Sequence, residues 1–349
     1  MVMRSIERRQ RVLLTGATGV VGQALLPRLT AGSVVCLARR PALPGTATAI
    51  GDVSAPRLGL SAGEYRRLAG WATTVVHAAA VTDFTSEALE RTNVDGTRRV
   101  VEFVQDSGAH LVHVSTAYLE AGGGSAAGPA RYAASKRAGE QVVRESGVAA
   151  TIARPSIVIG DSTTGVVARH QGVYKAGGAF LSGRFPIAPL DPDWFIDLIP
   201  QDVVAAGLVR LLDGRRAGET VWLTAGPRAL RLRQVTDLLT ELAWQIGRPI
   251  MPPRFVDPGM YRRLIAPVLL EALPAAMRTS LTRTMDELAL YMAATEPFPT
   301  SVPALLGVAE TQLPDTAAAF VRCMTAWAAE RGLVDRCAAG EPAELESAS

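Results

Sequence analysis

A tyrosine and a lysine four residues apart, Tyr132 and Lys136, have the spacing of a proton-transfer pair. The pattern around them predicts a helix over Arg131–Ser146, and residues four apart on a helix share one face. A lysine cation favours the phenolate form, so we expect Lys136 to lower the pKa of Tyr132 from about 10 towards the working pH. Such a tyrosine can exchange a proton with a carbonyl oxygen while the carbonyl carbon gains a hydride.

Two hydroxyl residues, Ser115 and Thr116, follow the apolar run Leu111–Val114, which predicts a strand. Either hydroxyl could bond the same carbonyl oxygen. A tyrosine and a lysine at this spacing occur by chance in many helices, but together with these hydroxyls and the glycine turn described next they favour a catalytic site. No metal-ligand cluster and no Ser-His-Asp arrangement in the sequence competes with this interpretation.

A glycine-rich turn follows the first apolar run, Val12–Thr15. Gly16 would let the chain turn sharply, Gly19 would let a diphosphate approach the backbone, and Gly22 would let the next helix lie close against the strand. Free N–H groups in the first turn of that helix would face the phosphates. Any tight strand-to-helix turn favours glycine, but this position near the start of the chain favours a dinucleotide site made by Thr15, Gly16, Thr18, Gly19, Val20, Val21 and Gly22.

The second predicted strand ends in Ala38-Arg39-Arg40, and no acidic residue occurs between Gly22 and Gly51. NAD sites usually place an acidic residue there to bind the ribose 2′-hydroxyl. A guanidinium would instead neutralise a 2′-phosphate and bind it with two hydrogen bonds. The sequence therefore predicts NADPH, the alternative being that both arginines are merely solvated on a loop.

Further along the chain, Asp52 with the adjacent Val53 is placed to bond the adenine, or alternatively to cap the following turn. The strand ending at His77 continues into Ala78, Ala79 and Ala80, small residues that suit a backbone passing against a dinucleotide. His77 itself is predicted to be a packed strand-end residue rather than a catalyst.

Short apolar runs alternate with helical patterns over the first two thirds of the chain, which predicts an α/β fold with a doubly wound, Rossmann-type parallel sheet. The predicted strands are Val12–Thr15, Val34–Leu37, Thr74–His77, Leu111–Val114, Ala150–Ala153 and Val221–Thr224. Helical patterns cover Glu87–Asp106, Arg131–Ser146, Gln201–Leu212, Gln234–Ile246, Pro258–Leu270, Ala275–Ala294 and Thr316–Arg331.

These patterns divide the chain into a dinucleotide-binding domain over 1–225, a smaller helical substrate domain over 226–337 and a disordered tail over 338–349. The loop-rich segment 160–200 is predicted to be an excursion on the substrate side, because segments leaving the carboxyl ends of strands line the ligand crevice. Core contacts between domains are the alternative use of the apolar residues beyond 225, such as Leu264, Ile265, Val268 and Leu269.

Composition is that of an ordinary globular chain: 349 residues, 48% hydrophobic, 20% charged and a net charge of +3. The basic residues are scattered, which gives a nucleic-acid role little support. Three cysteines without metal-ligand spacing favour a reducing cytoplasm over a disulfide framework. We find no secretory signal and no apolar run near the ~18 residues of a membrane span, so we expect a soluble cytoplasmic protein.

The glycine turn, Ser115-Thr116 and Tyr132-x-x-x-Lys136 together resemble the extended short-chain dehydrogenase/reductase superfamily. A narrower resemblance, over about residues 10–225, is to its fatty acyl-CoA reductase (male-sterility) and thioester reductase branch. The motifs that carry it are Gly51-Asp-Val-Ser-Ala-Pro-Arg-Leu-Gly-Leu60, Val76-His-Ala-Ala-Ala80, Asn93-Val-Asp-Gly-Thr97 and Arg154-Pro-Ser-Ile-Val-Ile-Gly-Asp-Ser-Thr-Thr-Gly165. Two departures from the branch are expected: a free-standing chain without adenylation and carrier domains, and a short glycine-rich loop over 120–129.

The resemblance implies that Thr116, Tyr132 and Lys136 carry catalysis, with Thr116 rather than Ser115 facing the substrate. Pro155, Ser156 and Ile157 would flank the nicotinamide. It also implies reduction by NADPH of an acyl thioester, on coenzyme A or a carrier protein, to an aldehyde, with onward reduction to an alcohol left open. Arginines that could meet the phosphates of such a carrier, or alternatively be solvated helix faces, are Arg254, Arg262, Arg263, Arg278 and Arg283.

Three other functions stay open at this point. An NADPH-dependent ketone or aldehyde reductase would use the same residues without a thiol leaving group. A non-catalytic NADP-binding protein is disfavoured because a pure binder has no need of Tyr132. A nucleotide-sugar epimerase is disfavoured by the stretch after Arg154-Pro155 and by the predicted preference for NADP.

Overall fold

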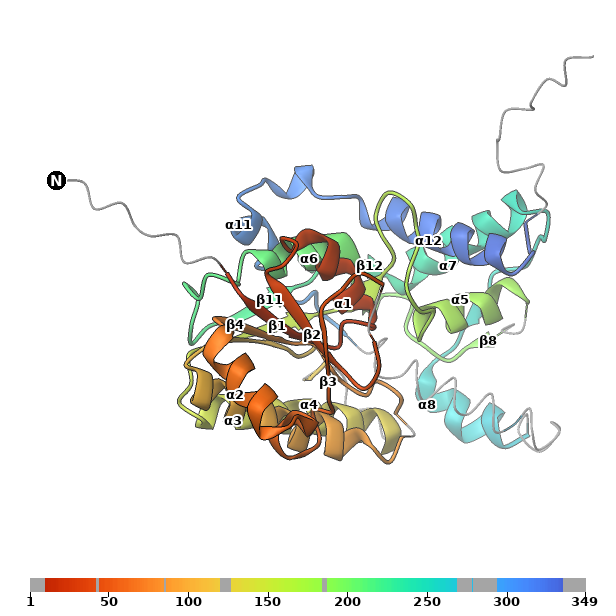
Figure 1. Ribbon diagram of the computed structural model, residues 1–349. Coiled ribbons are helices and arrows are strands. Elements are labelled where there is room, and N and C mark those ends of the chain that lie inside the picture. Colours follow the sequence, from red (N-terminus) through yellow and green to blue (C-terminus); the bar gives the residue numbers. More distant parts are fainter. Residues whose placement is uncertain are drawn as a thin grey trace, which may run out of the picture.

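The computed structural model describes residues 10–41, 44–84, 86–119, 127–183, 187–268, 278 and 294–334. Its centre is a parallel sheet of seven strands in the order β11-β6-β5-β4-β1-β2-β3 (Figure 1). The strands are β1 (Val12–Thr15), β2 (Val34–Ala38), β3 (Thr48–Ile50), β4 (Thr74–His77), β5 (His110–Val114), β6 (Ala150–Pro155) and β11 (Thr220–Leu223). The predicted α/β fold with a doubly wound, Rossmann-type sheet is confirmed.

Side chains alternate along each strand, so each strand contributes to two apolar layers. In β1, Val12 and Leu14 pack on the side of α1 (Val20–Leu25) and α6 (Gln201–Val209), whereas Leu13 packs on the other side. That other side is covered by α2 (Ala62–Trp71), α3 (Gly96–Ser107) and α4 (Ala127–Glu145), which lie together below the sheet in Figure 1. Burial of both faces explains why the strands read as continuous apolar runs.

The helix predicted over Glu87–Asp106 is interrupted by a π-helical turn, Arg91–Asp95, before α3 begins. Asn93 lies in this turn and is buried. Its amide accepts the Val81 N–H at 2.8 Å and donates to the Val81 carbonyl and to Ser135 Oγ, both at 3.0 Å. The turn thus ties the irregular segment that follows β4 to helix α4, and π-turns of this kind are frequent at functional sites.

The segment 160–200, predicted to be loop-rich, contains a helix and three short strands: α5 (Val173–Leu181), β8 (Ile187–Ala188), β9 (Phe195–Ile196) and β10 (Leu198–Pro200). β10 pairs with β7 (Ile157–Ile159), so the chain returns beside the strand from which it left. Two glycines, Gly177 and Gly178, obscured the helical pattern of α5 in the sequence. A Cβ at Gly178 would collide with the Trp327 ring, and one at Gly177 would lie 2.6 Å from Met324 Cε, so α5 packs closely against α12 at both glycines.

The region beyond residue 225 contributes to two parts of the molecule. α7 (Leu232–Gln245) and α12 (Thr316–Glu330) pack with α5 in an apolar cluster beside the sheet. The short helix α11 (Val302–Leu306) instead joins the sheet core through Val302 and Leu305, next to α6. Two short strands, β12 (Leu230–Arg231) and β13 (Arg254–Phe255), pair with β9 and β8.

The helical pattern predicted from Pro258 begins with α8 (Pro258–Met260) and a π-helical turn, Tyr261–Ile265. The helix predicted over 275–294 lies almost wholly outside the described residues, as do Leu269, Arg283 and the tail 338–349. In the described ranges, no helix is both long and apolar enough to span a bilayer.

Candidate active site

A cavity of about 240 Å³ opens where β1, β4, β5 and β6 end. In a doubly wound sheet this edge is where ligands bind. Its wall includes these predicted residues: Gly16, Gly19, Val20, Val21, Gly22, Ala78, Ala80, Ser115, Thr116, Tyr132, Lys136, Pro155, Ser156 and Ile157. The structure therefore brings together, from five separate stretches of sequence, the glycine turn and the residues expected to carry the chemistry.

Two glycines of the turn, Gly16 and Gly22, have no room for a side chain. Gly16 has a φ of +76°, and a Cβ there would lie 2.5 Å from the backbone of Ala78 and Ala79. A Cβ on Gly22 would collide with the Gly16 carbonyl oxygen. The Gly19 N–H is bonded to the Gly16 carbonyl at 3.0 Å, whereas the N–H groups of the first turn of α1, from Val20 on, have no partner within the helix, as the binding of a dinucleotide diphosphate requires. The described residues therefore fit a nicotinamide dinucleotide at this edge of the sheet.

Thr15 and Val53, both expected to bind the cofactor, have structural tasks instead. Thr15 is fully buried, its hydroxyl lies 2.8 Å from His77 Nδ1, and it accepts the Ala79 N–H at 3.2 Å. It therefore ties β1 to β4. Val53 is buried in the apolar layer under α3. Neither side chain, nor Ala79 beside them, forms part of the cavity wall.

Asp52 caps the turn that follows it, which is the second of the two tasks we considered. Its carboxylate accepts the Ser54 N–H at 2.9 Å and the Ser54 hydroxyl at 2.8 Å. Burial raises the pKa of Asp52, but these hydrogen bonds and the charges of Arg39 and Arg91 together lower it below the usual value. Arg39 and Arg40 are exposed just after β2, and Thr18 is exposed in the glycine turn.

Tyr132 departs from our expectation. Burial raises its pKa to about 12, and a hydrogen bond with the Thr116 side chain only partly opposes this rise. The Lys136 ammonium donates to the Val114 carbonyl at the end of β5, at 2.8 Å, and its charge does not offset this rise in the pKa of the phenol. The phenol is therefore protonated at neutral pH, which is the form that can donate a proton to a carbonyl oxygen.

Lys136 is itself buried, with 4% of its surface exposed. Burial lowers its pKa to about 8, and the negative charge of Glu140 limits the fall. Glu140, one turn further along α4, is fully buried and receives two hydrogen bonds from Arg154, at 2.8 and 2.7 Å. The Arg154 guanidinium lies over the Trp222 ring, 4.9 Å from its centre. This network links α4 to β6 and β11 behind the cavity.

Two buried histidines lie beneath Lys136. Burial, followed by the charge of Lys136, lowers the pKa of His77 to about 3 and that of His113 well below its usual value. His77 makes hydrogen-bond contacts with Thr15 and with Thr97, the latter at 3.2 Å. Both rings are therefore neutral, and His77 is the packed strand-end residue that the sequence predicted.

The cavity wall also contains residues that we did not predict: Thr82, Val114, Tyr118, Val158, Arg169, Gln171, Gly172, Val173 and Tyr174. Five of these come from the segment 160–200, where the sequence indicated the side of the molecule but gave no signal for individual residues. Tyr118 is two residues after Thr116, and its hydroxyl contacts the backbone of the buried Asp197 at 3.2 Å. It fixes β9–β10 against the end of β5.

Comparisons with known proteins bear on the family of this chain. A family model described as male sterility protein matches residues 42–128 and 120–208. The ceramide reductase of Caulobacter vibrioides is 30% identical over 275 residues, which cover 73% of this chain and 76% of that protein. A hybrid PKS-NRPS synthetase of Talaromyces variabilis and a linear gramicidin synthase of Brevibacillus parabrevis are 32% and 30% identical over 58% of this chain. The chain spans only 6% and 5% of these two relatives.

One solved structure gives the same family likeness, and a second shares the fold. The terminal R domain of the myxalamid PKS-NRPS pathway superposes with a TM-score of 0.71 at 25% identity, covering 93% of this chain and 92% of that one. The reductase domain of a nonribosomal peptide synthetase from Mycobacterium tuberculosis gives a TM-score of 0.68 at 22% identity, over the same shares of the two chains. The second likeness concerns the fold alone.

Gly22→Ala tests whether the glycine turn, Gly16–Gly22, binds the dinucleotide. The added methyl group has to displace the backbone of Gly16, so we expect a loss of about 1–3 kcal/mol in the free energy of unfolding and at least a ten-fold weaker dinucleotide affinity. Chemical denaturation and fluorescence titration with NADPH measure the two effects. Gly63→Ala in α2, where no atom lies within 4 Å of the new Cβ, is the control and should be neutral or slightly stabilising. Equal NADPH affinities in the two variants would contradict the binding of the dinucleotide at the glycine turn.

Deprotonation of Lys136 should decrease the activity at high pH. With a pKa of about 8 it is charged below that pH and neutral above it, so kcat/KM should fall about ten-fold per unit at higher pH. Lys136→Arg keeps the charge and should move this limit upwards, even if its activity is lower throughout. The measurement is a pH profile of kcat/KM from pH 6 to 10. A flat profile through pH 8 in the unmodified protein would show that the lysine charge is not required.

Proposed function

We propose, from the premise that this chain belongs to the male sterility protein family, that it reduces an acyl thioester to an aldehyde with NADPH. As the motifs indicated, it is an NAD(P)-dependent oxidoreductase of the extended short-chain dehydrogenase/reductase type. The observation that carries the proposal is that Thr116, Tyr132 and Lys136 lie together in the wall of the dinucleotide cavity. Relatives named as PKS-NRPS synthetases and reductase domains support a thioester as substrate.

In this mechanism Thr116 and Tyr132 hold the carbonyl oxygen of the thioester. NADPH, when bound, supplies a hydride to the carbonyl carbon. Tyr132 gives its proton to the oxygen, which produces a hemithioacetal, and Lys136 stabilises the phenolate that remains. The carbon–sulfur bond then breaks, and the thiol and the aldehyde leave. Solvent returns a proton to Tyr132, so one thioester, one NADPH and one proton give one aldehyde, one thiol and one NADP⁺.

Arg39 and Arg40 support NADPH as the cofactor. Both side chains are exposed at the end of β2, the position at which the adenine ribose lies in such folds. The acidic residue nearest to them in the sequence is Asp52, and its carboxylate already accepts two hydrogen bonds from Ser54. Two exposed guanidinium groups at this position favour a 2′-phosphate over a 2′-hydroxyl.

The thioester would be presented by coenzyme A or by a carrier protein. The proposed division remains a dinucleotide-binding domain over 1–225 and a substrate region over 226–337, with the qualification that α11 packs on the sheet core. In the latter region Arg254, Arg263 and Arg278 are exposed and are the candidates for contact with a carrier phosphate. The exposed Leu264 and Val268 and the half-buried Ile265 lie on the same stretch of chain.

Reduction of a ketone or an aldehyde is the second candidate function. It is favoured by the ceramide reductase, of which this chain covers 76%, because ceramide contains no thioester. The same Thr116 and Tyr132 would serve it. The two functions differ in one product: only thioester reduction releases a thiol for each acyl group reduced.

Tyr132→Phe should decrease turnover by roughly 10²–10⁴-fold, because the positioned proton donor is lost, and should leave NADPH affinity within about three-fold. The assay follows NADPH oxidation and free thiol together on a panel of acyl-CoA thioesters and the matching aldehydes. Tyr65→Phe, which removes a remote hydroxyl bonded to Asp106 at 2.8 Å, is the control and should retain full turnover. Oxidation of NADPH on aldehydes or ketones only, with no thiol released from any thioester, would favour the second function.

Arg39→Ala combined with Arg40→Ala should weaken NADPH binding at least ten-fold, the order expected for losing charge-assisted hydrogen bonds, and change NADH binding by no more than about three-fold. Isothermal titration with each cofactor measures this. The control is the double change Arg66→Ala and Arg67→Ala, another exposed arginine pair, on α2. If the unmodified protein bound NADPH and NADH equally well, the preference would be refuted.

A further inference from the structure

Arg169 forms part of the wall of the dinucleotide cavity, and the mechanism above does not use it. The residue is exposed and lies in the irregular segment that leads into α5. Among the described residues that line this cavity, Lys136 and Arg169 are the two with a positively charged side chain, and none has a carboxylate. The charges of the wall therefore favour the binding of an anion.

The two positive charges differ in whether other groups compensate them. The Lys136 ammonium donates to the Val114 carbonyl at 2.8 Å and is one turn of α4 from the buried carboxylate of Glu140. Arg169 has no salt bridge and no side-chain hydrogen bond to any part of the chain that the structure describes. A guanidinium binds a phosphate group with two parallel hydrogen bonds, so an uncompensated arginine in this wall is suited to a phosphate.

Contacts of the two residues that follow Arg169 hold this segment at the cavity. His170 is not part of the wall, and its Nε2 atom lies 3.7 Å from the Glu330 carboxylate of α12. Gln171 accepts a hydrogen bond at 3.1 Å from the hydroxyl of Thr82, in the segment that follows β4. The segment with Arg169 is therefore attached both to a helix beside the sheet and to the edge of the sheet.

The diphosphate of the dinucleotide is the phosphate group that this cavity has to hold. It is expected at the glycine turn, Gly16–Gly22, which lines the same cavity. Val20 of this turn packs against the apolar cluster that contains Val173 and Tyr174, so the turn is close to the start of α5. The turn has no charged side chain, whereas a diphosphate is negatively charged on both phosphates. Of the cationic side chains in the described wall, Arg169 is the one left to neutralise it.

We propose that Arg169 binds the diphosphate of the nicotinamide dinucleotide together with the glycine turn. The inference adds a cofactor-binding residue in the segment 160–200, and it does not depend on the reduction of a thioester, because the dinucleotide can be bound without a substrate. NADPH and NADH have the same diphosphate, so both should depend on Arg169 to the same extent. Arg39 and Arg40, by contrast, should matter for NADPH alone.

Arg169→Gln tests the inference by removing the charge at an exposed position. The affinities for NADPH and for NADH, measured by fluorescence titration at constant ionic strength, should each fall at least ten-fold, the order expected for the loss of charge-assisted hydrogen bonds. Arg169→Lys keeps the charge but not the two parallel hydrogen bonds, so it should lose about three-fold for both dinucleotides. A thermal melt without nucleotide checks that each variant is folded.

Lys175→Gln is the matched control, because Lys175 is also exposed, lies in the same stretch of chain and is not part of the cavity wall. Its affinities for both dinucleotides should stay within about three-fold of those of the unmodified protein, since salt screens a charge that does not contact the ligand. Competition by 2′-AMP, which has the 2′-phosphate but no diphosphate, gives a second readout. Its affinity should be unchanged in Arg169→Gln and reduced in the double variant of Arg39→Ala and Arg40→Ala.

Two results would overturn the inference. The first is an unchanged affinity for both dinucleotides in a folded Arg169→Gln protein; if the KM for acyl-CoA thioesters then rose, Arg169 would bind the diphosphate of coenzyme A instead. The second is weaker binding of NADPH with unchanged binding of NADH, which would assign Arg169 to the 2′-phosphate. Failure to reduce any thioester would refute the proposed function and leave these binding measurements unaffected.

Discussion

A lysine can remain charged inside a protein only where neighbouring groups compensate for the water it has lost, and the architecture around the site is arranged by this requirement for Lys136. Its ammonium is bound by the end of β5, and the carboxylate of Glu140 offsets its charge from one turn away on α4. Glu140 is fully buried in turn and is balanced by Arg154 of β6, whose guanidinium lies on Trp222 of β11. These contacts fix α4 across three strands, and with it the position of Tyr132.

The same burial determines the protonation states that the reaction needs. Removal from water raises the pKa of Tyr132 and lowers those of His77 and Lys136. The phenol and the imidazole are therefore neutral at neutral pH, while the ammonium is still charged but has a pKa of about 8, close to that pH. A neutral phenol beside a lysine that is still charged suits proton donation to an oxygen. Donation leaves a buried phenolate, and the charge of Lys136 is what can offset the cost of forming it there.

Sequence patterns were sufficient to predict the strands of the sheet and the glycine turn at its edge, and the physical reasons can be identified. Strands buried on both faces give apolar runs, and the short distance between Gly16 and Ala78 leaves a glycine signature. Patterns failed where a residue's task depends on distant neighbours. The glycine motif predicted that Thr15 binds the cofactor, although its hydroxyl contacts His77. The helical pattern of α5 was obscured by two glycines that lie against Met324 and Trp327. Strand β3 is too short to show a periodicity. The pKa of Tyr132 depends on burial, which no local spacing encodes.

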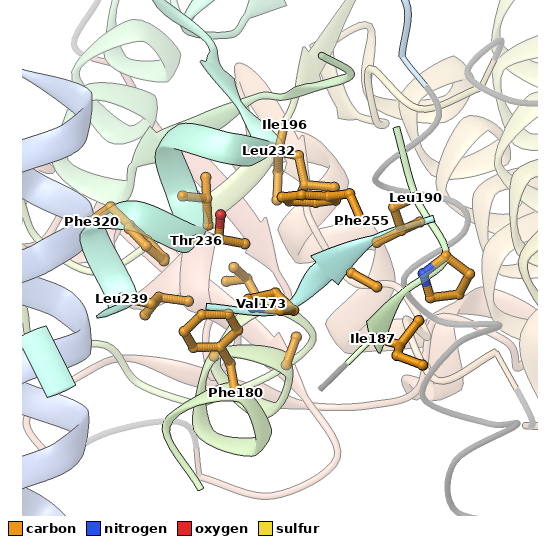
Figure 2. A pocket seen from close by; sticks show the side chains of 16 residues that line it. Val173, Phe180, Ile187, Leu190, Ile196, Leu232, Thr236, Leu239, Phe255 and Phe320 are labelled. Carbon is orange, nitrogen blue, oxygen red and sulfur yellow. The ribbon is translucent and has the colours of Figure 1, made fainter. Parts of the chain in front are cut away.

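The dinucleotide cavity and a second, apolar cavity of about 70 Å³, lined by residues such as Phe180, Leu239 and Phe320 (Figure 2), differ in how they are built. The first is held by buried charges and by backbone contacts among residues of the central sheet and α4, where a change in one group leaves another unbalanced. The second is formed by α5, α7, α12 and two-residue strands, whose side chains meet through contacts that tolerate exchange of one hydrophobic residue for another of similar volume. Such an exchange leaves the Lys136 network undisturbed, because no residue of that network lines the apolar cavity.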